Sequence, residues 1–171
     1  MTFDLQPTLR GELVTVRPLS SDDWEPMLAT ASDPKVWEQH PVSDRYKEPV
    51  FREYFDGAIA CASSFAFVEN NTGKIIGSCR FYGFDADKSE IEIGWTFLGR
   101  DYWGGTYNRE IKQLLLEHAF RFVQTVVFWV GEDNIRSRRA MEKIGGILRD
   151  GVHYRELSGD DPYVMYEIRK G

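Results

Sequence analysis

The 171-residue sequence has few cysteines, no long apolar run and no excess of positive charge. Its two cysteines, Cys61 and Cys79, are too few for a disulfide framework, so we expect two buried free thiols. No apolar stretch approaches the length that spans a bilayer, and residues 1–5 lack the basic and apolar segments of a signal peptide. These absences exclude a disulfide scaffold and a membrane protein, and they favour a cytoplasmic location.

The charge balance is acidic, with a formal net charge of −6. A protein that binds duplex nucleic acid needs a basic stripe, so nucleic acid is excluded as a partner. The acidic balance is compatible with a cationic substrate such as an amine or a basic peptide, although solubility is the simpler explanation. The three histidines, His40, His118 and His153, lack metal-ligand spacing, so no metal is expected.

The length and the 42% apolar share are those of one globular domain, residues 1–171. Apolar periodicity and turn residues predict strands over 13–19, 64–69, 74–82, 91–98, 125–130, 147–157 and 163–168, helices over 24–31, 48–61, 107–122 and 134–144, and an aromatic loop over 36–41. The resulting order, β-α-α-β-β-β-α-β-α-β-β, predicts an α/β fold with one mixed sheet.

The most informative segment is the turn Trp103-Gly104-Gly105-Thr106-Tyr107-Asn108, which lies between a predicted strand and a predicted helix. Glycine lets the backbone approach a ligand and adopt positive φ, and the first free N–H groups of the helix point into such a turn. The turn therefore predicts an anion site for a phosphate-bearing ligand, although many strand–glycine–helix turns are only turns. It matches neither G-x-G-x-x-G nor G-x-x-x-x-G-K-[ST], which argues against dinucleotides and nucleoside triphosphates.

Four segments, 9–19, 91–95, 102–107 and 134–146, together resemble the GCN5-related N-acetyltransferase (GNAT) family. More narrowly, they resemble its group that acetylates the N-terminal α-amines of ribosomal proteins. The resemblance implies a GNAT fold, with a mostly antiparallel sheet of about seven strands flanked by four helices and splayed between the fourth and fifth strands. It also implies acetyl-CoA as co-substrate and direct attack of a primary amine, from a protein N-terminus or a small molecule, on the thioester.

The turn departs from the family pattern Q/R-x-x-G-x-G/A at two positions. Thr106 and Asn108 replace small residues where pyrophosphate normally meets bare backbone. Either these side chains narrow the site, or their polar groups donate hydrogen bonds to phosphate. A non-catalytic acyl-CoA-binding or interaction domain on the same fold is therefore the alternative function.

Acetyl transfer requires an acceptor for the amine proton and a donor for the departing thiolate. Glu92 is one candidate base, on a strand face shared with Glu90, but two solvated glutamates explain the same pattern. Glu156 is the second, near the end of the penultimate strand, where related enzymes carry an active-site glutamate; a charged strand end is its alternative. Ser137 is the candidate acid, one helical turn after Asn134, unless its hydroxyl bonds back to its own helix.

The resemblance supplies the remaining expectations. The thioester carbonyl should meet backbone N–H groups near Phe97 and Leu98, and Asn134 should contact the pantetheine arm. Arg139 should reach the phosphates, since a cation at a helix N-terminus is otherwise unfavourable. The expected cofactor-binding residues are Phe97, Leu98, Trp103, Gly104, Gly105, Thr106, Tyr107, Asn108, Asn134 and Arg139. The expected acceptor-binding residues are Trp37, His40 and Tyr54, which do not name the amine, and a homodimer is an open alternative.

Overall fold

The computed structural model describes residues 2–155 and 161–171, so the candidate base Glu156 lies outside the described residues. In chain order the elements are β1 (Leu9–Arg10), β2 (Val14–Pro18), the 3-10 helix η1 (Ser21–Asp23), α1 (Trp24–Ala31), α2 (Pro34–Trp37), α3 (Glu48–Ala60), β3 (Ser64–Glu69), β4 (Ile75–Asp85), β5 (Glu90–Leu98), the 3-10 helix η2 (Arg100–Tyr102), α4 (Thr106–Ala119), β6 (Thr125–Gly131), α5 (Ile135–Lys143), β7 (Ile147–Leu148), β8 (His153–Tyr154) and β9 (Pro162–Arg169).

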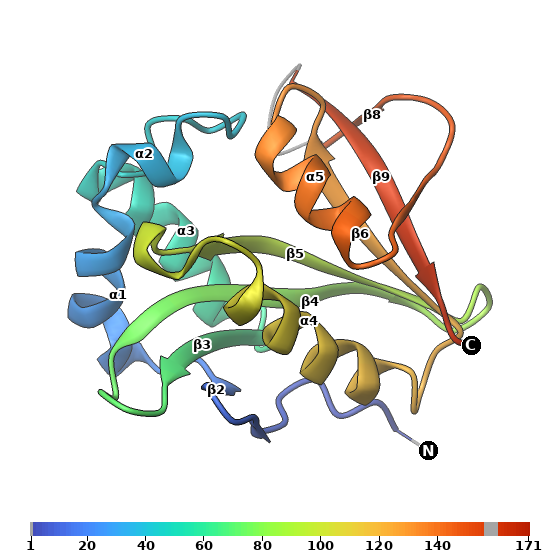
Figure 1. Ribbon diagram of the computed structural model, residues 1–171, viewed down its shortest axis with the longest axis horizontal. Helices are drawn as coiled ribbons and strands as arrows, with labels where there is room; N and C mark the ends of the chain where they lie inside the picture. Colours follow the sequence, from blue (N-terminus) through green and yellow to red (C-terminus); the bar gives the residue numbers. More distant parts are fainter. Residues whose placement is uncertain (1, 156–160) are drawn as a thin grey trace.

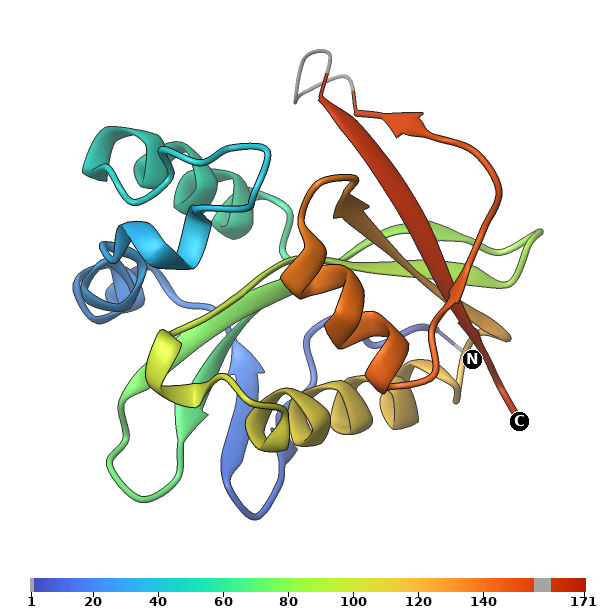
Figure 2. The same cartoon turned by 45° about the horizontal axis from the view of Figure 1, so that its top comes forward.

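These strands form one mixed sheet in the order β1-β2-β3-β4-β5-β6-β9-β7, with β8 also pairing with β9. All neighbouring pairs are antiparallel except β5 and β6, which run parallel and pair only where residues 90–92 face residues 125–127. Beyond this short ladder the two strands diverge, and β6 and β9 cross away from β3, β4 and β5 (Figures 1 and 2). The predicted mixed sheet and its splay are confirmed.

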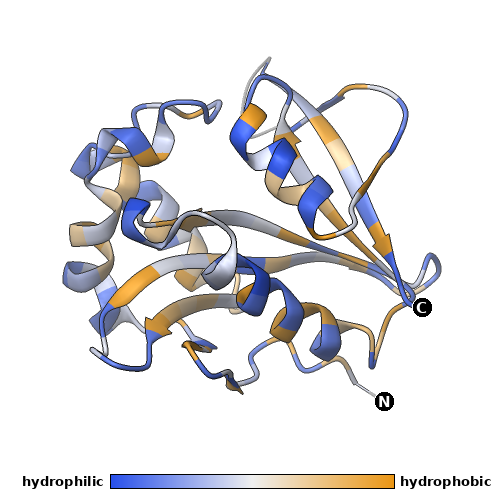
Figure 3. Ribbon diagram, in the orientation of Figure 1, coloured by the Kyte–Doolittle hydropathy of each residue, from blue (hydrophilic) through white to orange (hydrophobic). Residues whose placement is uncertain are grey.

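Two apolar cores lie on opposite faces of the sheet. One packs α4 and Met141 of α5 against the strands, and the other packs α1, α2 and α3 against them. Strand β3 shows the division, because Phe65 and Phe67 belong to the first core and Ala66 to the second, as alternating side chains require. Helices α4 and α5 carry both hydrophilic and hydrophobic residues, as helices that cover one face of a sheet should (Figure 3).

A partly exposed carboxylate contact attaches the first turns of α4 to the sheet. The side chain of Glu110 accepts hydrogen bonds from the backbone N–H groups of Glu12, Leu13 and Val14 at 3.0, 2.9 and 2.9 Å. Charge-assisted hydrogen bonds of this kind are stronger than neutral ones. These bonds tie α4, which follows the glycine turn, to the start of β2.

Three expectations about secondary structure need correction. The aromatic loop begins as the short helix α2, because Asp33 accepts a hydrogen bond from the N–H of Lys35 at 3.0 Å and Pro34 suits a first turn. The strand expected over 147–157 is interrupted between β7 and β8, where Gly151 has φ +96°. The long helix ends at Ala119, before the expected 122.

The short elements β1, β7, β8 and α2 raise the described total to nine strands and five α-helices, against about seven and four expected. Both cysteines are free thiols, with Cys79 buried and Cys61 partly exposed. Within the described part of the chain, no helix has the length and apolar character required to cross a membrane.

Candidate active site

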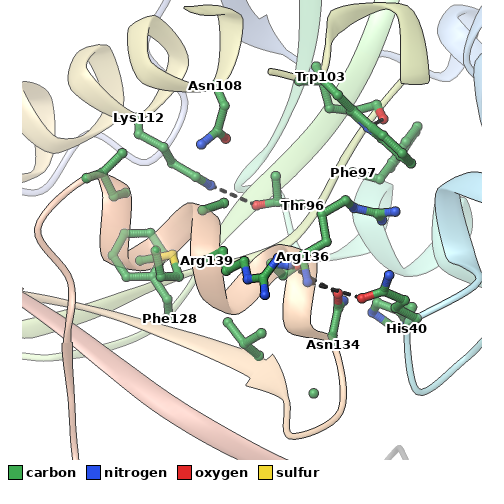
Figure 4. Close-up of a pocket in the computed structure, with 18 of the residues that line it drawn as sticks. His40, Thr96, Phe97, Trp103, Asn108, Lys112, Phe128, Asn134, Arg136 and Arg139 are labelled. Atoms are coloured by element: carbon green, nitrogen blue, oxygen red, sulfur yellow. Dashed lines mark hydrogen bonds between the residues drawn. The ribbon is translucent and has the colours of Figure 1, made fainter. Parts of the chain in front are cut away.

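A cleft of about 410 Å³ opens where β5 and β6 diverge. Residues 93–98 of β5 form one wall and residues 128–131 of β6 form the other. The glycine turn and the start of α4 close one end, and α5 lies along the cleft (Figure 4). The splay between the two parallel strands therefore exposes main-chain groups in the centre of the sheet, where a ligand can lie between them.

A β-bulge shapes the β5 wall. Ser78 faces Phe97 and Arg80 faces Gly94, so two residues of β5, Trp95 and Thr96, stand opposite one residue of β4. Trp95 has φ +53°, and its carbonyl accepts a hydrogen bond from the Tyr54 hydroxyl at 2.5 Å. A bulge leaves its extra residue outside the ladder. The bulge therefore interrupts the regular pairing of β5 at Trp95 and Thr96, two residues that line the cleft, and pairing resumes at Phe97 and Leu98.

The glycine turn has an open inner surface. Gly104 and Gly105 have φ values of +109° and +108°, and a Cβ added to either would meet no heavy atom within 4 Å. Gly105 is the N-cap of α4 and offers no side-chain cap, so the first-turn N–H groups of the helix are left without that partner. Free N–H groups and the positive end of the helix dipole at an open turn form an anion site.

The side chains of the turn do not all point into the cleft. Asn108 lines the cleft, whereas Thr106 is exposed and does not line it. Tyr107 points to the other side of α4, where its hydroxyl donates a hydrogen bond to Oε1 of Glu69 at 3.1 Å. Of the two substitutions that depart from the family pattern, only Asn108 places its side chain at the cleft.

Trp103 and Arg136 connect the turn to α5. The indole N–H of Trp103 donates to the carbonyl of Leu98 at 2.7 Å, and the Arg136 guanidinium lies 3.8 Å from the Trp103 ring centroid (Figure 4). Arg136 also donates to the carbonyl of Val36 in α2 at 2.9 Å. A cation–π contact of this kind stabilises by a modest amount. Through these two contacts Arg136 links α5 to the glycine turn and to α2 at the cleft.

Asn134 and Ser137 lie at the start of α5. Asn134 is buried, and its side-chain oxygen accepts a hydrogen bond from the Ser137 N–H at 3.2 Å, so it caps the helix as predicted. Ser137 lines the cleft, and its hydroxyl has no hydrogen bond to any other described residue. The alternative of a serine bonded back to its own helix is therefore wrong. Arg139 is exposed and lines the edge of the cleft.

Lys112 is a cleft residue that the sequence did not indicate. Its ammonium is buried and donates a hydrogen bond to Oγ1 of Thr96 at 3.0 Å, with the Phe128 ring centroid 5.4 Å away (Figure 4). Burial lowers the pKa of Lys112, and no carboxylate of the described residues lies within 4 Å of it. An ammonium has three donors, so this group has donors to spare for a ligand carbonyl.

Glu92 lies directly behind the cleft wall. Its carboxylate accepts a hydrogen bond from the Arg155 guanidinium, and only 5% of the residue is exposed. A Cβ on Gly94 would stand 2.6 Å from Oε1 of Glu92, so the carboxylate occupies the space over the backbone of Gly94, a residue that lines the cleft. Burial raises the pKa of Glu92, while Arg155 and Arg80 act in the opposite direction. The alternative of a solvated glutamate is therefore wrong for Glu92.

The structure brings only two of the three expected acceptor-binding residues to the cleft. Trp37 and His40 line the cleft, whereas Tyr54 is buried in the α1–α3 core and does not. Nδ1 of His40 accepts a hydrogen bond from the Val42 N–H at 2.9 Å, which leaves the ring proton on Nε2. Burial, together with nearby arginines, lowers the pKa of His40 to about 3. His40 is thus a neutral hydrogen-bond donor and a poor proton acceptor.

Comparison with known proteins places the chain among acetyltransferases. Residues 14–147 match the family model described as "Acetyltransferase (GNAT) domain". An uncharacterized N-acetyltransferase p20 from Bacillus licheniformis is 26% identical over 154 residues, which cover 84% of this chain and 86% of that protein.

Two solved structures share the fold. A GCN5-related N-acetyltransferase from Brucella melitensis has a TM-score of 0.84 and 17% identity over 98% of this chain and 80% of its own. A putative ribosomal-protein-serine acetyltransferase from Vibrio cholerae has a TM-score of 0.76 and 13% identity over 99% of this chain and 100% of its own. At these identities the two structures support the fold alone.

Proposed function

The chain belongs to the GNAT acetyltransferase family and is an N-acetyltransferase, and we propose that it transfers the acetyl group of acetyl-CoA to a primary amine by direct attack on the thioester. The observation that carries the proposal is the cleft between β5 and β6, which has an open anion site at one end and a β-bulge along its wall. The two features suit the two ends of one ligand, its phosphates and its acyl group.

The residues present fit acetyl-CoA. The open surface over Gly104 and Gly105 leaves room for pyrophosphate against the backbone, and the Asn108 amide and the Arg139 guanidinium supply further donors. Lys112 has donors available for an amide carbonyl of the pantetheine arm. Acetyl-CoA, when bound, supplies an activated acyl group. The backbone N–H groups around Phe97 and Leu98 are the proposed partners of its carbonyl oxygen, which becomes more negative as the amine attacks.

Proton transfer is assigned to two groups. Glu92 is the proposed acceptor of the amine proton, directly or through a water, because its carboxylate lies against the backbone of Gly94 in the cleft wall. Its raised pKa brings it closer to the pKa that an efficient general base needs. Ser137 is the proposed donor to the thiolate, because its hydroxyl lines the cleft with no competing partner among the described residues. Glu156 is kept as the second candidate base.

The test is the release of free thiol from acetyl-CoA in the presence of amines, with acetylated product identified by mass spectrometry. The panel contains peptides with free N-termini, polyamines and amino acids. We expect acceptor-dependent thiol release in a one-to-one ratio with acetylated amine. Saturable acetyl-CoA binding without thiol release for any amine would contradict the proposal and favour a non-catalytic acyl-CoA-binding domain.

A further inference from the structure

Three arginines lie against aromatic rings that line the cleft. They come from distant segments: Arg45 precedes α3, Arg80 lies on β4, and Arg155 follows β8. The guanidinium carbons of Arg80 and Arg155 lie 4.4 and 4.3 Å from the centroid of Trp95, a residue that lines the cleft.

The other aromatic residues here are shared by the same arginines. Arg155 also lies 4.5 Å from the centroid of Trp129, another cleft residue. Arg45 lies 5.2 Å from the centroid of Trp37, which lines the cleft as well. We define Arg45, Arg80 and Arg155 as the arginine cluster. Each member lies against an aromatic ring that lines the cleft, and none of the three arginines is itself a cleft-lining residue.

The cluster has more positive than negative charge. Glu92 pairs with Arg155, but neither Arg45 nor Arg80 has a carboxylate within 4 Å among residues 2–155 and 161–171. Arg80 is only 7% exposed; it donates one hydrogen bond to the carbonyl of Tyr54 at 3.3 Å, and its Nε has no partner in the described part of the chain. The exposed Asp44 neighbours Arg45 in the chain without forming an ion pair with it.

Guanidinium groups removed from water without a counter-charge are costly. Aromatic faces compensate part of this cost through cation–π contacts. A ligand anion compensates the rest, and a planar guanidinium is well suited to bind a carboxylate or a phosphate group. The neutral state of His40 agrees with this positive potential, because Arg45 and Arg155 are among the groups that lower its pKa.

We propose that the acceptor of this enzyme is a small amine that also carries an anionic group, a carboxylate or a phosphate, and that the arginine cluster binds that group. The inference rests on the proposed function and specifies its substrate class. Arg45, which is partly exposed, makes the direct contact, and the buried Arg80 adds positive potential. The local charge thus opposes the acidic net charge of the whole chain, which by itself was compatible with a cationic acceptor but is explained more simply by solubility.

The experiment compares matched acceptors at saturating acetyl-CoA. Each pair shares its primary amine and differs in the anionic group: an amino acid against its primary amide, and phosphoethanolamine against ethanolamine, with spermidine as a cationic acceptor. The amine of an amino acid amide is less basic, so amine reactivity alone favours the amide. We expect kcat/KM to be higher for an anionic member by about 10- to 100-fold, the range of a hydrogen bond to a charged group.

The variants Arg45→Gln and Arg80→Gln should each reduce this preference, while the preference of Arg52→Gln should stay at the wild-type value. Arg52 is a matched control, because it lies over an aromatic ring, Trp24, at 4.5 Å and pairs with Asp56 on the outside of α3, away from the cleft. If Arg80→Gln does not fold, Arg45→Gln carries the test alone, since Arg45 is less buried.

A preference in either pair identifies the anionic group that the cluster binds. If the uncharged member has an equal or higher kcat/KM in both pairs, or if spermidine exceeds both anionic acceptors, the inference is overturned while the acetyltransferase function stays intact. If no acceptor is acetylated, the same pairs are titrated by calorimetry into CoA-saturated protein. A tighter Kd for the anionic members, lost in Arg45→Gln, supports the anion site even though transfer has failed. Equal Kd values within each pair overturn it.

Discussion

Substitution of Gly104 by glutamate tests the anion site on which the proposed function depends. A carboxylate at this position both repels pyrophosphate and fills the space over the turn. A Cβ at Gly104 meets nothing within 4 Å, so the substitution creates no clash, and its cost to the apo-protein comes from placing a side chain at φ +109°. Such a conformation costs about 1–3 kcal/mol.

The ligand effect in the wild type can be estimated from mass action. Acetyl-CoA at 100 times its Kd stabilises the folded state by about 2.7 kcal/mol. For a chain of this length, that corresponds to a rise in Tm of about 5–10 °C. We expect Gly104→Glu to lower the Tm of the apo-protein and to abolish the rise with acetyl-CoA, as measured by thermal melts across a ligand titration.

Gly151→Glu is the matched control. Gly151 also has positive φ, +96°, has no heavy atom within 4 Å of an added Cβ, and does not line the cleft. This variant should show a similar loss of apo-protein Tm and keep the full acetyl-CoA shift. A folded Gly104→Glu protein that keeps the wild-type shift would refute the assignment of the turn and place the CoA site elsewhere.

Three further predictions concern the residues along the cleft. Asn134→Ala should lose about 1 kcal/mol in chemical denaturation because the cap is removed, and should bind acetyl-CoA more weakly by calorimetry; unchanged affinity would leave only the capping role. Ser137→Ala should lower kcat in steady-state assays with little change in the Kd of acetyl-CoA, and an unchanged kcat would exclude Ser137 as the acid. Because burial raises the pKa of Glu92, the rise of wild-type kcat/KM with pH should lie above the range of a free glutamate, and Glu92→Gln should flatten it with a loss on the order of 10²-fold. The same profile is measured for Glu156→Gln, and full rate with a wild-type profile in both variants would mean that the amine arrives neutral and that positioning alone accelerates the reaction.

Local signals in the sequence determined the elements and one end of the site. The glycine pair before a helical pattern predicted the open turn at Gly104 and Gly105, and Asn134 before a helix predicted its cap, because each of these features depends on residues adjacent in the chain. The order of elements predicted the mixed sheet and, with the family resemblance, the splay of its parallel pair. The short helix α2 was missed because a single turn has no apolar period to detect.

The acceptor side was decided only by the tertiary structure. Strand alternation placed Glu90 and Glu92 on one face, but only the pairing of β8 and β9 beside β6 brings Arg155 to the buried carboxylate of Glu92. In the sequence, Lys112 is not distinguishable from any other lysine of a helix. Only the divergence of β5 and β6 creates the cleft that its side chain lines. The arginine cluster joins residues 35 to 110 positions apart in the chain, and no local pattern encodes such a meeting, because it depends on how distant segments pack together.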